Sequence, residues 1–391
     1  MADNKDKKFL NVPALRFLEF TEEWNYESLD TIAPNIISGR SKPSLGEYNL
    51  YGSTGIIGKT ATADYSGDML LVARVGANAG SLQLVNDSCG ITDNTLIIKP
   101  CKLSSHYLYF YLQHYNLNRL VFGSGQPLIT AGMLKKVGIP FGNQLEQKKI
   151  ENFLCCIDER IATPNKIIED LKKLKSAIAE TLFCAPKESM PAKRLSTYSK
   201  EWKLVKLSDI CQRVQTKNTG SQCRRVLTIA AQHGLVNQED FFNKTVASEN
   251  LEGYYLLQKG DFAYNKSYSG DYAWGAIKRL ERYEQGVLSP LYICFRPDTA
   301  KVDADYLTHY FESKKWHKGI ADIAGEGARN HGLLNISVID FFNTIHRIPD
   351  LDEQKNIAQI INSLSSKLSC EQHIMQSLTM QRNYLLHKMF I

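Results

Sequence analysis

The sequence predicts an α+β fold, in which two mixed α/β domains are joined by two long helices packed as an antiparallel coiled coil. Three observations predict this fold: two similar opening segments, two similar helix-forming segments, and a different strand-rich body between each pair. The opening segment 12–33 matches 190–211, with Trp24 and Trp202 in register. Because the order of opening segment, body and helix occurs twice, the chain is a tandem of two related modules.

The 391 residues are enough for two domains with full-sized cores. We place the first domain at residues 12–143, the first long helix at 144–185, the second domain at 190–347 and the second long helix at 348–391. A tandem of this kind holds two similar surfaces in a fixed relation, which suits a target with two similar halves.

In the first body, short β-like runs alternate with glycine-containing turns, and an aromatic-rich segment with helical spacing follows them. The expected strands lie at 48–59, 68–75, 81–85 and 94–100, and the expected helix lies at 105–121. The second body repeats this order, with strand-like segments at 260–278 and 287–297 and a helical segment at 303–321. Each body is therefore predicted to be a mixed α/β domain.

Apolar residues recur at spacings of three and four from Gln144 to Phe183 and from Asp352 to Phe390. At 1.5 Å per residue, a helix of this length would reach roughly 60 Å, which is longer than one small domain. We therefore expect the two helices to pack against each other in antiparallel orientation. The alternative is that each helix folds back onto its own domain. Pro164 is expected to kink or break the first helix, because it lacks an amide hydrogen.

The composition is that of an ordinary globular protein, with 43% hydrophobic and 23% charged residues. No apolar stretch is long enough to span a bilayer, and the start, MADNKDKKF, lacks the apolar region of a signal peptide. We therefore expect a cytoplasmic protein without a membrane partner. The nine cysteines include no CxxC spacing, so we expect reduced, buried thiols and no zinc site.

The net charge is a modest +6, but lysines and arginines are concentrated in residues 193–225. The basic residues of this segment are Lys193, Arg194, Lys200, Lys203, Lys206, Arg213, Lys217, Arg224 and Arg225, against only Glu201 and Asp209. Such a density is typical of a surface that follows nucleic-acid phosphates, and an ordinary solvated face is the alternative interpretation.

Four motifs recur in both halves: Glu-Trp followed by Leu-x-x-Ile, Ile-Pro before each long helix, Glu-Gln-x-x-Ile at the start of that helix, and a glycine-rich turn late in each body. With these motifs the whole chain resembles the specificity subunits of type I restriction-modification enzymes. The resemblance implies two target recognition domains, each reading half of a split DNA sequence, and a helical spacer between them. Pro164 and the shorter second opening, IPDLDEQ, depart from the family pattern and bear on the spacer geometry.

The resemblance also implies partners and excludes catalysis by this chain. The helices would dock two modification (methyltransferase) subunits, and ATP-dependent restriction subunits would join that complex on double-stranded DNA. The chain would then be non-catalytic and would bind no cofactor or metal itself. S-adenosylmethionine, ATP and magnesium would belong to its partners.

Within each body, only side chains that reach base edges can read a sequence, typically Arg or Lys on guanine and Asn or Gln on adenine. The candidates in the first body are Lys42, Tyr48, Arg74, Asn78, Ser124 and Gln126. The candidates in the second body are Asn265, Lys266, Tyr268, Arg329, Asn330 and His331, with Arg224 and Arg225 as phosphate contacts. Each of these could instead be an ordinary solvated residue. The aromatic stripe at Tyr107, Phe110, Tyr111 and Tyr115 could stack on bases, but its helical spacing favours a place in the core.

Three alternative functions are open. Pro297-Asp298 with Glu312-Ser313-Lys314 has the lettering of a PD-ExK nuclease, in which two carboxylates hold a metal ion and a lysine assists water. A methyltransferase fusion would need an Asn-Pro-Pro or Asp-Pro-Pro site, but the chain has no Asn-Pro or Pro-Pro pair. A coiled-coil scaffold would bind proteins and have no affinity for DNA.

Overall fold

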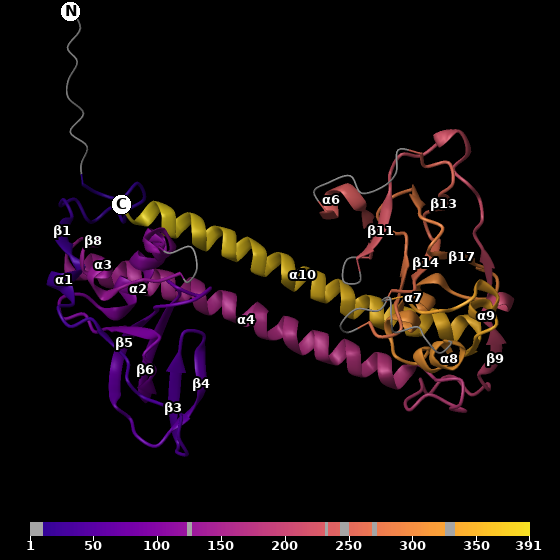
Figure 1. The fold of residues 1–391 in the computed structure, drawn as a ribbon, viewed down its shortest axis with the longest axis horizontal. Coiled ribbons are helices and arrows are strands. Elements are labelled where there is room, and N and C mark those ends of the chain that lie inside the picture. The colour runs from indigo at the N-terminus through magenta and orange to yellow at the C-terminus, as the bar shows by residue number, and fades with distance from the viewer. Residues whose placement is uncertain (1–10, 123–126, 231–233, 243–249, 268–271, 325–332) are drawn as a thin grey trace, which may run out of the picture. The chain divides into compact units, whose positions relative to one another are not determined.

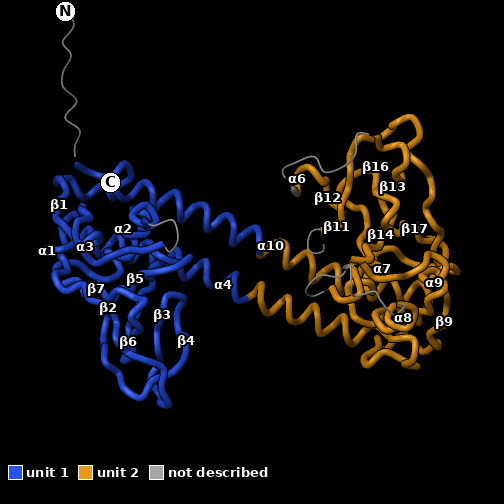
Figure 2. Tube along the Cα trace, viewed as in Figure 1, with its two compact units in different colours: residues 1–166, 372–391 blue, residues 167–371 orange. Residues whose placement is uncertain are grey.

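The computed structural model describes residues 11–122, 127–230, 234–242, 250–267, 272–324 and 333–391. The chain divides into two compact units (Figure 2): unit 1 comprises residues 1–166 and 372–391, and unit 2 comprises residues 167–371. The division falls within two helices of 39 residues each, α4 (Gln144–Leu182) and α10 (Leu351–Met389). Each unit therefore contains one body together with a part of both long helices.

Unit 1 is built around a six-stranded sheet with the strand order β2-β7-β5-β6-β3-β4 (Figure 1). Its strands are β2 (Ile37–Ser38), β3 (Tyr48–Gly52), β4 (Gly55–Thr60), β5 (Tyr65–Ala73), β6 (Leu82–Ile91) and β7 (Thr95–Ile98). Neighbouring strands are antiparallel except β3 and β6, which run parallel. A separate antiparallel pair joins β1 (Asn25–Ser28) to β8 (Gly138–Phe141), and the shorter helices are α1 (Leu29–Ile32), α2 (Ser105–Tyr115), η1 (Leu117–Leu120) and α3 (Ala131–Lys135).

Unit 2 contains a four-stranded antiparallel sheet with the order β10-β17-β14-β15. Its strands are β10 (Cys211–Arg213), β14 (Phe262–Asn265), β15 (Ala276–Arg279) and β17 (Ile293–Pro297). Three antiparallel pairs accompany it: β9 (Lys203–Lys206) with β18 (Ile345–Ile348), β11 (Leu227–Ala230) with β12 (Gly234–Asn237), and β13 (Tyr255–Gln258) with β16 (Gln285–Leu288). The shorter helices are α5 (Leu207–Ile210), η2 (Thr219–Ser221), α6 (Gln238–Phe242), α7 (Ala304–Glu312), α8 (His317–Ile323) and α9 (Val338–Phe342).

The two units share one frame. In each, the strand after the opening segment pairs with the strand before the long helix, β1 with β8 and β9 with β18. The strand order β2-β7-β5-β6 corresponds to β10-β17-β14-β15, and the helices α2 and α7 follow these sheets. Side-chain caps start both helices, because Ser104 accepts a hydrogen bond from the amide of Tyr107 and Asp303 accepts one from that of Tyr306. The β3-β4 hairpin of unit 1 and the pairs β11-β12 and β13-β16 of unit 2 are additions to this frame.

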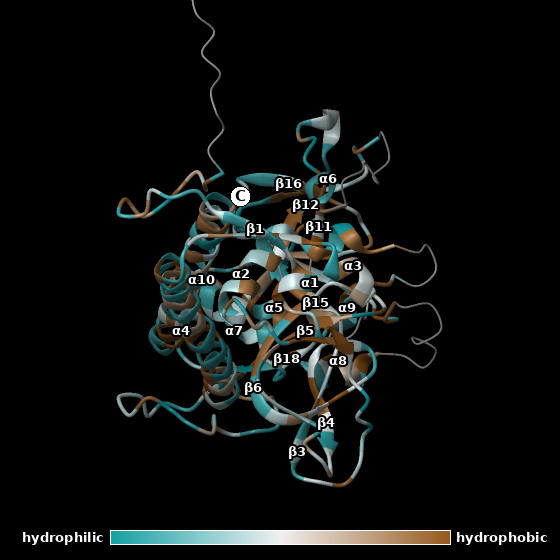
Figure 3. Cartoon of the chain, turned by 90° about the vertical axis from the view of Figure 1, so that its left-hand side faces the viewer, coloured by the Kyte–Doolittle hydropathy of each residue, from teal (hydrophilic) through white to brown (hydrophobic). Residues whose placement is uncertain are grey.

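Both long helices contribute to the core of each unit. In unit 1, Leu154 of α4 belongs to the same buried cluster as Leu386 of α10. In unit 2, Leu182 of α4 shares a cluster with Ile357 of α10. The start of α4 thus lies with the end of α10, and the end of α4 lies with the start of α10, so the helices are antiparallel. The hydropathy colouring shows that both helices are amphipathic (Figure 3). The alternative in which each helix folds back onto its own domain is wrong, because each begins in one unit and ends in the other.

Helix α4 continues through Pro164, so the expected break does not occur. The backbone loses one hydrogen bond at the proline, yet buried residues hold the helix on either side, Ile157 before it and Ile168 and Leu171 after it. Next to the proline, the Thr163 hydroxyl donates to the carbonyl of Glu159 at 3.4 Å. Tertiary packing of the apolar stripe therefore overrides the local preference of proline.

Two expected helices and one expected strand are divided. The segment 105–121 is helical as α2 only to Tyr115, because Asn116 adopts a left-handed conformation with φ 58°. The segment 303–321 forms α7 and α8, since the Ser313 hydroxyl donates to the carbonyl of Tyr310 at 2.6 Å and closes α7. The strand at 48–59 is the β3-β4 hairpin, which turns at Gly55 with φ 109°. None of the helices in the described part of the chain combines the length and apolarity that a bilayer crossing requires.

Candidate nucleic-acid interface

Two matching ion pairs fix the opening segments onto the long helices. Arg16 donates to both carboxylate oxygens of Glu146, at 2.7 and 2.8 Å, and Arg194 does the same to Glu353, at 2.8 and 2.7 Å. Both glutamates are buried, and these bonds raise the pKa of each arginine despite the opposing effect of burial. Arg194 is therefore a structural residue, and it belongs neither to a phosphate-following surface nor to a solvated face.

The glutamines beside these glutamates also have structural partners. The side chain of Gln147 donates to the carbonyl of Gly142 at 2.8 Å, and that of Gln354 donates to the carbonyl of Pro349 at 2.9 Å. The Glu-Gln pair that recurs in the sequence therefore ties each helix start to the segment before it, and the arginine of the opening segment adds an ion pair to the same glutamate.

The end of each long helix enters an aromatic core. In unit 1, Phe390 lies with its ring centroid 5.5 Å from Tyr107 and 6.4 Å from Trp24. In unit 2, Phe183 lies 5.3 Å from Tyr306 and 5.8 Å from Tyr310. Phe183 and Phe390 occupy the same position in the two helix repeats. These contacts hold both helix ends against the bodies that carry the candidate reading residues.

The aromatic stripe of α2 lies in this core. Tyr107 and Tyr111 are buried, and their hydroxyls donate to the carbonyls of Pro140 at 3.0 Å and Gly138 at 2.8 Å. Burial raises the pKa of both tyrosines well above 10. Rings with these partners are not available for stacking on bases, so the core interpretation of the stripe is confirmed.

In unit 1, the turn after β5 carries Arg74 and Asn78. The amide of Arg74 donates to Asn94 at 2.9 Å, and the carbonyl of Arg74 accepts from Ile129 at 2.9 Å. The amide of Gly76 donates to Pro127 at 3.0 Å, so the turn lies against a residue that flanks 123–126. The guanidinium of Arg74 is half-buried, where it donates to the hydroxyl of Ser38 at 3.3 Å, whereas Asn78 is exposed.

In unit 2, Asn265 ends β14 and Lys266 follows it, in the corresponding place. The carbonyl of Lys266 accepts from Leu334 at 2.9 Å, its ammonium donates to Ile336 at 3.4 Å, and Ser267 forms a β-bridge with Leu333. This turn therefore lies beside residues that flank 325–332. The amide oxygen of Asn265 accepts from Ser267 at 3.0 Å and so shapes the turn.

The structure thus brings candidates from equivalent strands to the same place in both units, next to the residues that flank 123–126 and 325–332. The remaining loop candidates, namely Ser124, Gln126, Tyr268, Arg329, Asn330 and His331, lie outside the described residues.

Lys42 and Tyr48 lie elsewhere in unit 1. Lys42 is exposed in the segment before β3, and Tyr48 is the first residue of β3, opposite Thr60. Among the described residues, no hydrogen bond joins either side chain to the turn at Arg74. We therefore place Lys42 and Tyr48 on the hairpin side of the sheet, apart from the reading turn.

Aromatic partners hold several of the exposed basic residues of unit 2. The guanidinium of Arg225 lies 4.3 Å from the ring centroid of Tyr283, and Arg224 is exposed beside it. The ammonium of Lys217 lies 3.9 Å from the ring of Tyr255, whose hydroxyl accepts from Arg213 at 3.4 Å. Sequence reasoning missed Tyr255 and Tyr283, because each is distant in sequence from the cation that it orients.

The first part of the chain matches a known protein family. Residues 16–173 match the family model described as type I restriction modification DNA specificity domain. This segment belongs to the type I specificity family. It contains the first opening segment, the turn at Arg74 and the start of α4, and unit 2 repeats the same frame.

Two curated proteins carry the same description in their names. The specificity subunit of type I restriction enzyme MjaVIII from Methanocaldococcus jannaschii is 24% identical over 321 residues, covering 74% of this chain and 71% of that protein. A protein from Mycoplasma genitalium that carries the name of a type I specificity subunit is 29% identical over 142 residues, covering 35% of this chain. The match spans only 37% of the Mycoplasma protein's length.

Solved structures share the fold. The S subunit of a type I restriction-modification system from M. genitalium has a TM-score of 0.64 at 18% identity, covering 97% of this chain and 99% of that one. A chain from a study of complex assembly and conformational transition of the type I system has a TM-score of 0.50 at 14% identity, covering 94% and 97%. The family model, the relatives and the shared fold together confirm the resemblance to specificity subunits.

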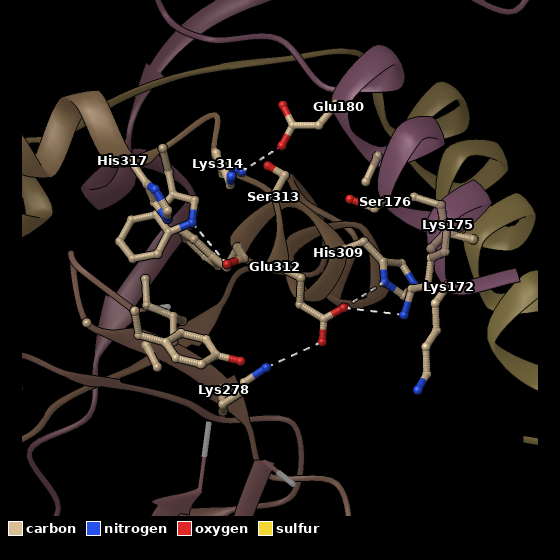
Figure 4. Close-up of a pocket in the computed structure, with 18 of the residues that line it drawn as sticks. Lys172, Lys175, Ser176, Glu180, Lys278, His309, Glu312, Ser313, Lys314 and His317 are labelled. Atoms are coloured by element: carbon tan, nitrogen blue, oxygen red, sulfur yellow. Dashed lines mark hydrogen bonds and ion pairs between the residues drawn. The ribbon is translucent and has the colours of Figure 1, made fainter. Parts of the chain in front are cut away.

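The nuclease alternative finds no support in the positions of its two carboxylates. The carboxylate of Asp298 pairs with Lys301 at 3.3 Å in the loop after β17. That of Glu312 pairs with Lys175 and Lys278, each at 3.5 Å, at the end of α7 (Figure 4). Each carboxylate thus has lysine partners of its own, and the described residues contain no group of three or more side chains suited to a metal ion.

Proposed function

We propose that this chain is the non-catalytic specificity subunit of a type I restriction-modification system, and that each unit reads one half of a bipartite DNA target. The observation that carries the proposal is the duplicated turn, which follows β5 in unit 1 and β14 in unit 2 and lies beside a late loop in both. A reader of two half-sites needs the same kind of surface twice.

The side chains at these turns suit base recognition. Arg74 keeps guanidinium donors beyond the one given to Ser38, and arginine recognises guanine through two such donors. Asn78 and Asn265 carry amides that can pair with adenine. Lys266 would act on guanine or on a nearby phosphate. The sequence-based candidates Ser124, Gln126, Tyr268, Arg329, Asn330 and His331 are proposed for the same surfaces, and Lys42 and Tyr48 are proposed to contact DNA from the hairpin side of unit 1.

Phosphate contacts would come from the cations that aromatic rings orient in unit 2. Arg225 on Tyr283 and Lys217 on Tyr255 are held by rings, so less side-chain entropy is lost when a phosphate binds. Arg224 and Arg213 extend this basic surface. These contacts set the position of the duplex and leave base choice to the turns.

The long helices would dock the modification subunits, with restriction subunits joining the complex. In unit 1, α4 and α10 expose large apolar side chains, namely Leu145 (77% exposed), Met380 (59%) and Tyr384 (60%). Exposed apolar groups on a helix pair suit a protein partner. S-adenosylmethionine, ATP and magnesium would be bound by those partners, and this chain would bind no cofactor.

The proposal is tested by changing one turn at a time. The variants Arg74→Ala and Lys266→Ala are assembled with the modification subunits, and the methylated sequences are mapped. We expect each variant to relax base choice in one half-site only, with a loss of about 1 to 3 kcal/mol of discrimination at the affected position. Lys318→Ala serves as the control, because this lysine pairs with Asp322 on α8.

Two outcomes would contradict the proposal. If both variants alter the same half-site, the units do not divide the target between them. If the assembled wild-type complex shows no affinity for duplex DNA at low salt, the chain is a scaffold for proteins only.

A further inference from the structure

Unit 2 contains a cavity of about 510 Å³ that the proposed reading of DNA does not use (Figure 4). It lies between the last part of α4, strand β15, the turn from α7 to α8, and α10. Four lysines line it, Lys172 and Lys175 from α4, Lys278 from β15 and Lys314 after α7. Its volume is in the range of ordinary small-molecule sites.

Positive charge in this cavity exceeds the negative charge that faces it. The carboxylates in its lining are those of Glu312 and Glu180. Glu312 shares its charge between Lys175 and Lys278, at 3.5 Å each. Glu180 accepts a hydrogen bond from the backbone amide of Lys314 at 3.3 Å. Among the described residues, no ion pair is recorded for the ammonium groups of Lys172 and Lys314, so the lining carries a net positive charge.

The state of Glu312 agrees with this excess. Burial opposes the charge of this carboxylate, but His309 and the ammonium groups of Lys175 and Lys278 outweigh that effect and lower its pKa to about 2. One fully ionised carboxylate therefore serves two lysines whose side chains are only 27% and 16% exposed. These ammonium groups are partly desolvated and share one carboxylate at 3.5 Å. A further anion would therefore stabilise their charges.

In the equivalent place of unit 1, the cation has a carboxylate partner of its own. By the register of the long helices, Lys175 corresponds to Arg382, and by that of the shorter helices, Glu312 corresponds to Gln113. Arg382 donates to the carboxylate of Asp158, with one bond at 3.1 Å, and to Gln113 at 2.7 Å. The guanidinium thus has both a carboxylate and an amide partner within the protein.

Unlike Lys175, the other three lysines of the cavity have uncharged counterparts in unit 1. The helix register matches Lys172 with Thr379, and the strand register that aligns Lys266 with Arg74 matches Lys278 with Gln83. Lys314 corresponds to Tyr115. The frame common to both units therefore does not need these three lysines, and their presence in unit 2 calls for a partner outside the frame.

We propose that this cavity of unit 2 binds a phosphate group, held by Lys172, Lys175, Lys278 and Lys314. A phosphate offers several acceptor oxygens and up to two negative charges, which suits a cavity that is lined by several lysines. The group could come from a small phosphate compound or from the backbone of a nucleic acid. The inference does not rest on base reading by the turns.

Inorganic phosphate is the first probe, applied to the full chain and followed by thermal unfolding against chloride at equal ionic strength. A ligand that binds the folded state raises the unfolding temperature. We expect phosphate to stabilise the wild-type chain, and the variant Lys172→Gln/Lys314→Gln to need about tenfold more phosphate for the same effect, since charge-assisted bonds are lost. Both lysines are exposed residues outside the core, so the variant is expected to fold.

The matched control is Lys301→Gln/Lys318→Gln, which removes two lysines of the same unit that pair with Asp298 and Asp322. It is expected to respond to phosphate as the wild type does. Equal responses of the lining variant, the control and the wild type would overturn the proposal.

A second measurement separates the two sources of phosphate. If a nucleic-acid backbone occupies the cavity, the lining variant also binds a duplex of unrelated sequence more weakly, and phosphate competes with that duplex. If a small phosphate compound occupies it, duplex affinity is unchanged. A chain that binds phosphate but no DNA would support this inference and contradict the proposed function.

Discussion

His346 shows how a single buried residue makes this fold sensitive to pH. Its ring lies between the hydroxyl of Tyr310, 3.0 Å from Nδ1, and that of Thr344, 2.8 Å from Nε2. Thr344 already donates its hydrogen to the carbonyl of Phe341, so it accepts from Nε2, and Nδ1 accepts from Tyr310. The neutral ring is therefore the form that satisfies both neighbours.

Burial lowers the pKa of His346 to about 4, so the folded protein holds the ring neutral while the unfolded chain binds a proton below pH 6.5. The contribution of neutral His346 to the free energy of unfolding is present in full above pH 6.5 and is lost as the pH falls toward 4. We expect His346→Gln to remove on the order of 3 kcal/mol of this pH dependence. Urea unfolding between pH 7 and pH 4.5 measures it, and identical pH slopes for variant and wild type would contradict it.

The buried pair of Arg194 and Glu353 gives a second prediction at this scale. Their side chains are 10% and 1% exposed, so Glu353→Gln leaves an uncompensated buried cation. We expect a loss of about 3 to 5 kcal/mol in the free energy of unfolding. Glu284→Gln is the control, because its pair with Lys259 is exposed and worth less than about 1 kcal/mol. Comparable losses in both variants would mean that burial does not set the strength of the pair.

Single residues at the candidate interface were predictable where local chemistry decides their place. Glycines on either side of Asn78 indicated a turn after Arg74, and the structure has that turn, with positive φ at Gly76 and Gly80. Arg194 was assigned wrongly, because its partner Glu353 is distant in sequence. The rings of Tyr255 and Tyr283 were missed for the same reason, since no local pattern indicates which cation an aromatic ring contacts.

At the scale of elements, the ends of the two long helices are the least local feature of the fold. Phe183 follows α4, which begins in unit 1, and fills an aromatic core in unit 2. Phe390 follows α10, which begins in unit 2, and fills an aromatic core in unit 1. We expect Phe183→Ala to destabilise unit 2 and Phe390→Ala to destabilise unit 1, each by about 3 to 5 kcal/mol through the cavity created. Hydrogen exchange resolves the two units, so loss of protection in the wrong unit would contradict the assignment.

The periodic elements were the most predictable, and their limits were the least. A continuous apolar stripe indicated two long helices, and the observed α4 and α10 begin and end within a few residues of the expected bounds. Hydrophobic periodicity says nothing of capping bonds, so the ends of α2 and α7 at Asn116 and Ser313 were missed. The general preference of proline predicted a break in α4, where burial on both sides of Pro164 keeps the helix.

At the scale of the whole molecule, the fold class was predictable because the sequence states its frame twice. The bodies were less predictable, since β3-β4 in unit 1 and β11-β12 and β13-β16 in unit 2 are additions with different sequences. Repetition identifies what the copies share and gives no information on what each copy adds. The candidate reading turns belong to the shared frame, but their residues differ between the two copies.

The two units are completed by segments that are distant in sequence. The amide of Leu15 donates to the carbonyl of Lys388 at 2.8 Å in unit 1, and the guanidinium of Arg194 donates to Glu353 at 2.8 Å in unit 2. We expect removal of residues 372–391 to expose the core around Trp24 and Tyr107, and to leave unit 2 protected. Hydrogen exchange measures this, with peptides from β5 losing protection and peptides from β14 keeping it. Loss confined to unit 2 would mean that the division of the helices is wrong.

This contribution of α10 to unit 1 sets an order of events during synthesis. A nascent chain usually folds its first domain first. Here the ribosome must translate all of residues 167–371 before the segment 372–391 that carries Phe390 emerges. Unit 1 is therefore encoded first but completed last. Until Phe390 packs against them, the aromatic residues around Trp24 and Tyr107 are exposed and can bind a chaperone.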